Sequence, residues 1–599
     1  MNTLYSRRLP SRWIRILALQ GGSGTSPIHV RLQEADIDEW PTFAALSYVW
    51  GDPSRREYIH ISGQRISVTK SLFDALCHFR PPDEELLIWA DALCINQDDP
   101  GERAEQVQLM REIYSRSASV MVWLGPDSDG QAACAIPLIE SVYQACENHA
   151  AAKGVELLDM AHFTPATERF EGLDPQAGWV LSRQWFTRVW CVQEIVLARS
   201  SKVYIGSHSL DWIKLGVTAA WLSEQSLATD YDVPAELEGL SWDTAYNMFD
   251  TDGLSEFSLL DVLVAFRDFN ATDPRDKVYG LLGLVGEESL EGFRGVDYKK
   301  SVVDVYADVV RTSVGASGNL ASLCYAKHGR EYARNGFPSW VSRWDMSENA
   351  SSLLHSLSLT AWENGDKHGL PSLAAFEPTA DGTVALSGVR FDTIAWATDV
   401  LGVEHFKKEI LPTEAMRHPF LGIWQRASSS KGYATSVTSA DRPFAGIMEM
   451  ALTLTAGFTD GYEPVMDLET EGLGRFHADF FAYIRQLFDR AGGRSDTFDP
   501  LEIALCDGDA TRFRVAASRA CDQRRVFETA AGFYSLAPAC AEEGDVVVLL
   551  HGGPVPLVLR QVGDGWILLG DSFIGPLMPE TADESIRRMF GDEEVFILV

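Results

Sequence analysis

The sequence lacks the short patterns by which many enzymes and metal proteins are identified. It has no GxxxxGK[ST] loop, no GxGxxG after its first predicted strand, no GxSxG elbow and no HExxH. Its nine cysteines include no CxxC pair, and its histidines form no metal-like cluster. A zinc ribbon and a disulfide framework are therefore not indicated, and no metal is expected. Scattered, reduced thiols are typical of a cytosolic protein.

Long apolar runs and excess positive charge are missing as well. No run approaches the roughly 18 apolar residues of a membrane span. The apolar stretch at 13–19 is interrupted by Arg15, and we interpret it as a first strand and not as a signal peptide. The net charge of −34 argues against nucleic acid and anionic membranes as partners, since both require a basic surface. We therefore expect a soluble, cytoplasmic protein.

With 599 residues, the chain is too long for one hydrophobic core. Residues 1–210 contain alternating strand and helix signals, which predict an α/β domain. Residues 211–380 are mainly helical by pattern. Residues 381–599 predict a C-terminal α+β module with a helical insertion at about 404–490 and a terminal β-meander that forms a small barrel or sheet.

Polar and aromatic side chains come after two of the predicted strands. The apolar runs 43–49, 86–90 and 119–124 predict a parallel or mixed sheet, in which ligands bind at the carboxyl ends of the strands. Residues 47–52 (SYVWGD) and 91–97 (DALCINQ) occupy two such ends. Roles as turn and cap residues explain Gly51 and Asp52 well. They explain the aromatic and amide residues less well, namely Tyr48, Trp50, Asn96 and Gln97.

The stretch 185–197 (WFTRVWCVQEIVL) predicts a helix with a buried stripe of valines. Trp190 and Glu194 lie four residues apart and so share another face of that helix. A carboxylate beside an indole suits a small-molecule pocket. The structural alternative is a surface glutamate that comes one turn after a core tryptophan. Cys191 has no evident histidine partner and is interpreted as a buried thiol.

Four blocks, in this order and spacing, resemble the fungal heterokaryon incompatibility (HET) domain. They are ALSYVWGD at 45–52, LIWADALCINQ at 87–97, ER…Q…M…IY at 102–114, and WF through the glutamate at 185–194. The segments 273–283 and 338–340 resemble segments located C-terminal to the HET domain in many members. In the first of these, Arg275 and Asp276 are expected to pair across the turn.

The resemblance implies fungal innate immunity: allorecognition with programmed cell death as its output. HET domains are similar to TIR domains, which implies a TIR-like (flavodoxin-like), mostly parallel sheet flanked by helices. The block at 190–194 (WCVQE) resembles a TIR signature whose glutamate cleaves NAD. By position, Glu194 becomes the candidate catalytic residue and Trp190 a pocket wall. Six further residues complete the predicted site, the last three because they come directly after a strand: Ser47, Tyr48, Trp50, Asp91, Asn96 and Gln97.

The sequence leaves three functions open. An enzyme would cleave NAD at the nicotinamide–ribose bond, with Glu194 stabilising an oxocarbenium-like transition state and NAD as substrate, with no cofactor. A non-enzymatic module would signal by self-association or by binding another incompatibility protein. A third protein would bind a nucleotide derivative without turning it over.

Overall fold

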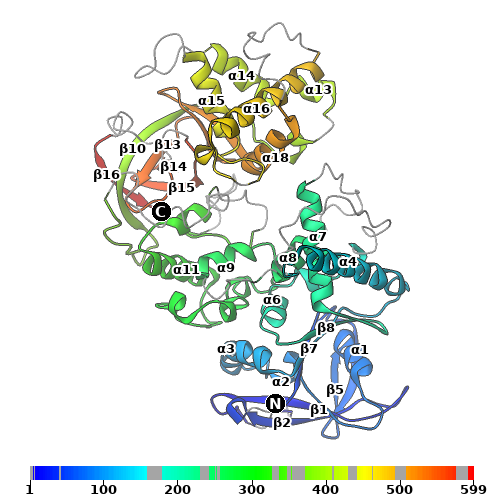
Figure 1. Ribbon diagram of the computed structural model, residues 1–599. Coiled ribbons are helices and arrows are strands. Elements are labelled where there is room, and N and C mark those ends of the chain that lie inside the picture. The colour runs from blue at the N-terminus through cyan, green and yellow to red at the C-terminus, as the bar shows by residue number, and fades with distance from the viewer. Residues whose placement is uncertain are drawn as a thin grey trace. The chain divides into compact units, whose positions relative to one another are not determined.

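The structure is a computed structural model of the chain (Figure 1). It describes residues 4–5, 7–39, 42–157, 178–228, 242–249, 251, 257–326, 336–346, 353, 371–407, 410–429, 442–461, 463–492, 508–574 and 591–599. The chain forms two compact units, Met1–Val305 and Tyr306–Val599. The three-part division expected from the sequence stays a prediction.

A nine-stranded sheet forms the centre of the first unit, in the order β5-β4-β2-β1-β6-β3-β7-β8-β9. Its strands are β1 (Trp13–Leu19), β2 (His29–Asp36), β3 (Ala44–Tyr48), β4 (Arg56–Ile61), β5 (Gln64–Thr69), β6 (Leu86–Trp89), β7 (Ser119–Trp123), β8 (Ser201–Ile205) and β9 (His208–Asp211). The strands expected from the apolar runs are thus confirmed, including the first one, and β4 and β5 form a hairpin.

The sheet is mixed, and not mostly parallel as expected. The four neighbours β6, β3, β7 and β8 run parallel, which fits strands that are buried on both faces; every residue of β3 is buried. Antiparallel partners join this centre on both sides, because β1 pairs with β2 and β6, and β8 pairs with β9. The apolar runs predicted a parallel or mixed sheet, and the mixed alternative is confirmed; the mostly parallel sheet came from the TIR resemblance, which does not account for the antiparallel pairing of β1, β2 and β9.

Helices cover both faces of this sheet: α1 lies on one side of β7 in Figure 1, and α3 and α6 lie on the other. The helices around the sheet and the site are α1 (Lys70–Phe79), α2 (Asp91–Cys94), α3 (Pro100–Arg116), α4 (Ala132–Lys153), α6 (Val189–Val196), α7 (Trp212–Ala228), α8 (Trp242–Phe249), α9 (Leu259–Ala265) and α10 (Asp276–Tyr279). Thr69 caps α1, and Asp99 caps α3 by accepting from two backbone amides.

The carboxyl ends of β3 and β6 lie side by side, which determines where the site forms. Ala45 is opposite Trp89 in this parallel pair, so the segments after both strands leave the same edge of the sheet. Gly51 turns the first segment with a φ of +73°, a conformation that glycine adopts without strain. Because β6 and β7 lie on opposite sides of β3, the chain changes direction here, and such points favour ligand pockets.

The second unit contains a seven-stranded sheet in the order β12-β11-β10-β13-β14-β15-β16, and an added β10–β16 pairing closes five strands into a small barrel. Its strands are β10 (Val384–Ala397), β11 (Arg524–Thr529), β12 (Tyr534–Pro538), β13 (Val546–Leu550), β14 (Leu557–Val562), β15 (Gly565–Asp571) and β16 (Glu593–Leu598). Helices α13 (Pro412–Ala415), α14 (Pro419–Ser429), α15 (Arg442–Leu454), α16 (Thr470–Arg490) and α18 (Ala510–Cys521) separate β10 from β11, so the predicted helical insertion is confirmed.

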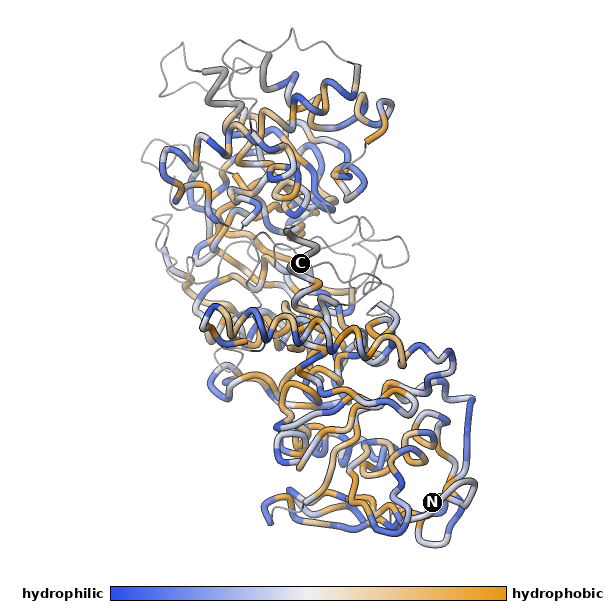
Figure 2. The backbone as a smooth tube through the Cα atoms, turned by 45° about the vertical axis from the view of Figure 1, so that its right-hand side comes forward, coloured by the Kyte–Doolittle hydropathy of each residue, from blue (hydrophilic) through white to orange (hydrophobic). Residues whose placement is uncertain are grey.

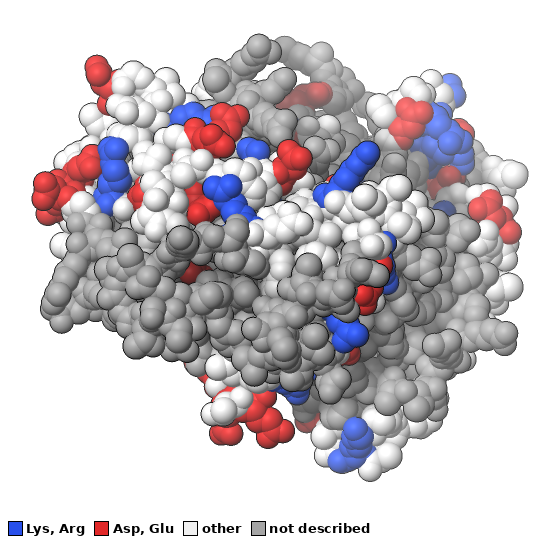
Figure 3. Space-filling model, turned by 90° about the horizontal axis from the view of Figure 1, so that it is seen from above, with Lys and Arg blue, Asp and Glu red and all other residues white. Residues whose placement is uncertain are grey.

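Figure 2 shows orange, apolar stretches inside the folded parts and blue, polar stretches along outer loops. On the face shown in Figure 3, basic and acidic side chains are interspersed among the described residues. Within the described ranges, no helix is both long enough and apolar enough to cross a membrane.

Candidate functional site

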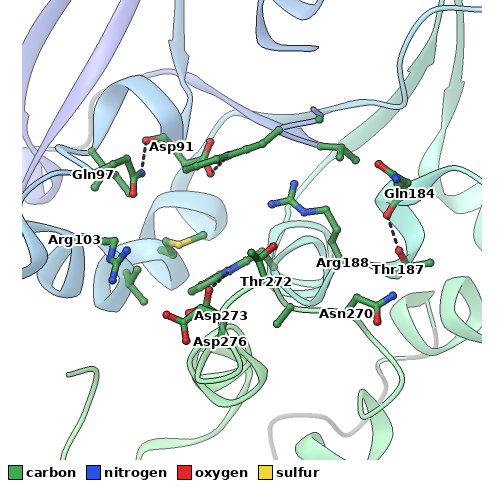
Figure 4. A pocket seen from close by; sticks show the side chains of 18 of the residues that line it. Asp91, Gln97, Arg103, Gln184, Thr187, Arg188, Asn270, Thr272, Asp273 and Asp276 are labelled. Carbon is green, nitrogen blue, oxygen red and sulfur yellow. Dashed lines mark hydrogen bonds between the residues drawn. The ribbon is translucent and has the colours of Figure 1, made fainter. Parts of the chain in front are cut away.

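A pocket of about 850 Å³ opens in the first unit at the carboxyl ends of β3 and β6. Figure 4 shows Asp91 and Gln97 facing Asp273 and Asp276 across this pocket, with Arg103 at one end and Gln184 and Thr187 at the other. The lining comes from four stretches: Val49, Trp50, Gly51 and Asp52; Asp91, Ile95, Gln97, Arg103, Val107 and Met110; Gln184, Thr187, Arg188 and Trp190; and Asn270, Ala271, Thr272, Asp273, Asp276 and Tyr298.

Asp91 organises the wall formed by the segments after β3 and β6. Its carboxylate accepts hydrogen bonds from Trp50 Nε1 at 2.8 Å and from the backbone N–H of Ala92 at 2.7 Å. The amide of Gln97 donates to the backbone carbonyl of Asp91 at 3.1 Å. Burial raises the pKa of Asp91, and the positive charge of Arg188 opposes that rise. Trp50, Asp91 and Gln97 therefore meet on the pocket, as the sequence predicts.

A buried ion pair supports this wall from behind. Arg15 Nη1 on β1 lies 2.5 Å from Glu102 Oε1 on α3, and both side chains are almost completely buried. Glu102 also accepts from the backbone N–H of Asn96 at 2.8 Å. The side chain of Asn96 accepts from the backbone N–H of Asp98 and is not among the lining residues. Asn96 thus shapes the loop, and Glu102 holds the loop in place.

Glu194 lies one layer behind the pocket lining. Its carboxylate accepts from Ser47 Oγ at 2.5 Å, and Trp185 Nε1 donates to the same hydroxyl at 2.7 Å. Only 5% of Glu194 is exposed, so it is not a surface glutamate. Burial raises its pKa to about 7, and the negative charge of Asp91 adds to the rise, while Arg188 and the Ser47 hydroxyl lower it. Ser47 and Tyr48, which were predicted as site residues, are also buried and are not among the lining residues.

Trp190 faces the pocket and is held there by a residue far along the chain. Its Nε1 donates to Asp276 Oδ2 at 3.1 Å, and the hydroxyl of Tyr298 donates to Asp276 Oδ1 at 2.8 Å. Burial raises the pKa of Asp276 to about 6. The start of α6 is also bound to this region, because the backbone N–H of Val189 donates to the carbonyl of Asn270 at 3.0 Å. Trp190 and Glu194 are therefore one helical turn apart but lie in different surroundings.

Arg275 pairs with Asp273 and not with Asp276, contrary to the expectation from the sequence. Its Nη2 lies 2.7 Å from Asp273 Oδ2, and its Nη1 donates to the backbone carbonyls of Tyr298 and Lys300. These contacts join the turn at 273–276 to the chain that returns 25 residues later. Both oxygens of Asp276 remain available to Trp190 and Tyr298.

The two arginines of the lining differ in their contacts. Arg188 Nη1 donates to the backbone carbonyl of Tyr48 at 2.6 Å and places positive charge near Asp91 and Glu194. Arg103 lies over the ring of Tyr298, with its Cζ 3.7 Å from the ring centroid.

Cys191 is completely buried, and burial holds the pKa of its thiol well above the usual range. Its thiol is therefore no nucleophile at neutral pH.

Most of the lining residues were not predicted as site residues, and four of these are Arg103, Arg188, Asp276 and Tyr298. Three of them stand within the motif-like stretches at 102–114, 185–194 and 273–283, whose patterns alone assign them no place in a pocket. Tyr298 stands in no such stretch, and no sequence signal singles it out.

The first unit is an α/β unit with a polar pocket at the ends of its parallel strands, the position at which ligands bind in folds of this class. Residues 43–194 match the family model described as Heterokaryon incompatibility protein (HET), which identifies a HET domain in this part of the chain. It is similar to Heterokaryon incompatibility protein 6, OR allele, of Neurospora crassa, with 25% identity over 97% of this chain and 96% of that protein. No solved structure matches the chain. The pocket residues from Asn270 to Tyr298 lie outside the matched region.

Proposed function

We propose that this chain acts in heterokaryon incompatibility, the allorecognition response of a filamentous fungus, with cell death as its output. The HET match and the similarity along nearly the whole length of a protein named for heterokaryon incompatibility support this role. The pocket supplies the chemistry through which the response proceeds.

We further propose that the pocket binds NAD and that Glu194 is the residue that cleaves the nicotinamide–ribose bond. The parallel strands support a TIR-like site: numbered along the chain as 1 to 4, they lie in the order 2-1-3-4, the beginning of the flavodoxin-like order. The pocket lies at the ends of strands 1 and 2 of that series. The observation that carries the proposal is a buried carboxyl with a raised pKa directly behind a pocket that contains two indoles.

The proposed reaction breaks the bond between the ribose and a cationic nicotinamide ring, which leaves as a neutral molecule. The positive charge that develops on the ribose is stabilised by a nearby carboxylate, and water then adds to the sugar. Trp50 and Trp190 offer ring faces for the bases. In the free protein Glu194 bonds to Ser47, and we propose that the ribose hydroxyls replace Ser47 as hydrogen-bond donors when NAD binds.

The test measures nicotinamide release from NAD by the purified full-length protein, with and without a crowding agent. We expect release by the wild type and a loss of at least about 100-fold in Glu194→Gln, which keeps the shape and removes the charge. Glu105→Gln, at a glutamate whose side chain is 52% exposed, is the matched control and should retain activity. Absence of release from well-folded wild type under both conditions would contradict the proposal.

A second candidate function, a non-enzymatic interaction module, is favoured by one specific observation. Glu194 already has a hydrogen-bond donor in Ser47 and is absent from the pocket lining, as expected of a structural carboxyl. In that case Glu194→Gln would leave cell death intact when expressed in the fungus. Stabilisation of the protein by NAD without any product would indicate the third function, binding without turnover.

A further inference from the structure

One end of the pocket carries an arginine whose donors have no acceptor among the described residues. Arg103 extends from the first turn of α3 into the lining. Its Nε is buried and forms no hydrogen bond with the described part of the chain. A buried guanidinium donor without an acceptor is costly, and such groups in native proteins call for an explanation.

Tyr298 positions the Arg103 guanidinium without using its hydrogen-bond donors. The Cζ of Arg103 lies 3.7 Å from the centroid of the tyrosine ring, which is a close cation–π contact. The hydroxyl of the same tyrosine donates to Asp276, so the ring is itself held in place. The contact occupies one face of the guanidinium and leaves its N–H groups for another partner.

The two acids of this wall that sense the charge of Arg103 are bonded elsewhere. Asp276 accepts from Trp190 with one oxygen and from Tyr298 with the other. Asp273 is paired with Arg275 through both of its oxygens. The positive charge of Arg103 lowers the pKa of both acids, yet the ion pair that Asp273 forms is with Arg275. The guanidinium of Arg103 therefore offsets the negative charge of these two acids without an ion pair to either of them. Its N–H groups have no acceptor among the described residues.

We propose that Arg103 is the phosphate-binding residue of the pocket, and that the ligand carries both a phosphate group and a cationic or neutral aromatic ring. The fork of a guanidinium matches two oxygens of a phosphate, and both nearby carboxylates already have other partners. The opposite wall, with Trp50 hydrogen-bonded to Asp91, suits the ring. This inference rests on the proposed function, since it assigns the diphosphate of NAD to Arg103.

The experiment measures binding by calorimetry to the full-length protein, with three probes: ADP-ribose, adenosine and inorganic pyrophosphate. Arg103→Gln should weaken ADP-ribose and pyrophosphate by about tenfold or more and leave adenosine unchanged. Arg103→Lys keeps the positive charge and loses the forked pair of donors. Its affinity for the two phosphorylated probes should therefore lie between the affinities of the wild type and of Arg103→Gln. Arg31→Gln is the matched control, because this arginine is 53% exposed and pairs with Glu85 outside the pocket.

Equal affinity of the wild type and Arg103→Gln for both phosphorylated probes would overturn the inference, as would a wild type that binds neither probe. An equal loss for adenosine would also overturn it, because it would indicate a general disturbance of the pocket. If Arg103→Gln does not fold, the comparison of Arg103→Lys with the wild type decides by the same criteria. Phosphate binding that depends on Arg103 without nicotinamide release would retain the inference and reject NAD cleavage. Release of nicotinamide, together with an unchanged affinity of Arg103→Gln for ADP-ribose, would retain NAD cleavage and reject the inference about Arg103.

Discussion

Trp190 and Glu194 show how much a single helical turn can separate two side chains. The indole faces the pocket and donates to Asp276, whereas the carboxyl turns into the protein and accepts from Ser47. Helix α6 has only eight residues and contacts β3, α3, α8 and α10. Because it is enclosed by these elements, neither residue reaches the outer surface, and each has acquired a different partner.

The raised pKa of Glu194 predicts a pH-dependent stability. An ordinary glutamate ionises near 4.5, whereas Glu194 in the folded chain ionises at about 7 because it is buried. Between these values the folded state holds a proton that the unfolded chain has lost, so the free energy of unfolding falls as pH rises from 4.5 to 7. Glu194→Gln does not titrate and should therefore gain stability relative to wild type by on the order of 1–3 kcal/mol between about pH 5 and about pH 8.

Thermal unfolding of wild type and Glu194→Gln at the two pH values measures this gain, with Glu105→Gln as the control that should behave like wild type. A difference in melting temperature that is the same at both pH values would show that Glu194 ionises normally in the folded protein.

Asp276 is expected to couple energetically to Trp190. Asp276→Asn offers one oxygen where the carboxylate offers two, so either the indole N–H or the Tyr298 hydroxyl loses its acceptor. We expect a loss of about 1–3 kcal/mol in the free energy of unfolding. In a Trp190→Phe background the same substitution should cost less, because one of the two donors is already gone. Fully additive effects in this double-mutant cycle would contradict the role of Asp276 as a holder of Trp190.

At the scale of elements, the first turn of α3 contains two adjacent residues with different roles, one in the buried support of the pocket wall and one in the pocket lining. Glu102 points inward to Arg15 on β1, and Arg103 points outward to the pocket. The strand that precedes the HET match therefore supports the loop that bears Gln97.

Arg15→Met is expected to destabilise the first unit by about 3–5 kcal/mol, because it leaves the buried Glu102 carboxylate without its counter-charge. Adding Glu102→Gln should recover part of the loss. Arg7→Met is the matched control: this arginine also pairs with a glutamate, but its side chain is 63% exposed, so we expect an effect below about 1 kcal/mol. Denaturant unfolding measures all three. Equal effects of Arg15→Met and Arg7→Met would mean that the buried pair does not hold the loop.

At the scale of the whole molecule, the region that matches the family is smaller than the unit that folds. Residues 43–194 contain neither β1, which pairs with β6 through Leu17 and Ile88, nor β8, which pairs with β7. They also lack the pocket wall from Asn270 to Tyr298. Two apolar strand edges would be exposed in such a fragment.

A fragment of residues 1–301, which ends just before helix α11 (Val302–Ser317), should be soluble and should unfold in one cooperative transition. A fragment of residues 43–194 should not, since it exposes the edges of β6 and β7. Circular dichroism melting curves of the two fragments make the comparison. Cooperative unfolding of 43–194 at the same temperature as 1–301 would show that the flanking strands are dispensable.

The sequence by itself determined the local elements and the residue types at the strand ends. Apolar runs and helical spacing predicted β3, β6 and β7 and the helix at 189–196, because these patterns arise within a few neighbouring residues. The polar blocks after β3 and β6 identified one wall of the pocket, including Trp50, Asp91 and Gln97. The HET resemblance rested on the same short blocks.

Only the tertiary structure decided how these parts face one another. The direction of β1 and β2, which makes the sheet mixed, depends on pairing between strands that are distant along the chain. The second wall depends on Asp276 and Tyr298, whose contacts with Trp190 and Arg103 join residues 86 or more positions apart. Periodicity reports which face of a helix is apolar, but it carries no information about which polar residue receives which partner once all sides are packed. That choice separates Trp190 from Glu194, and it leaves the Arg103 guanidinium without a hydrogen-bond acceptor in the part of the chain that the structure describes.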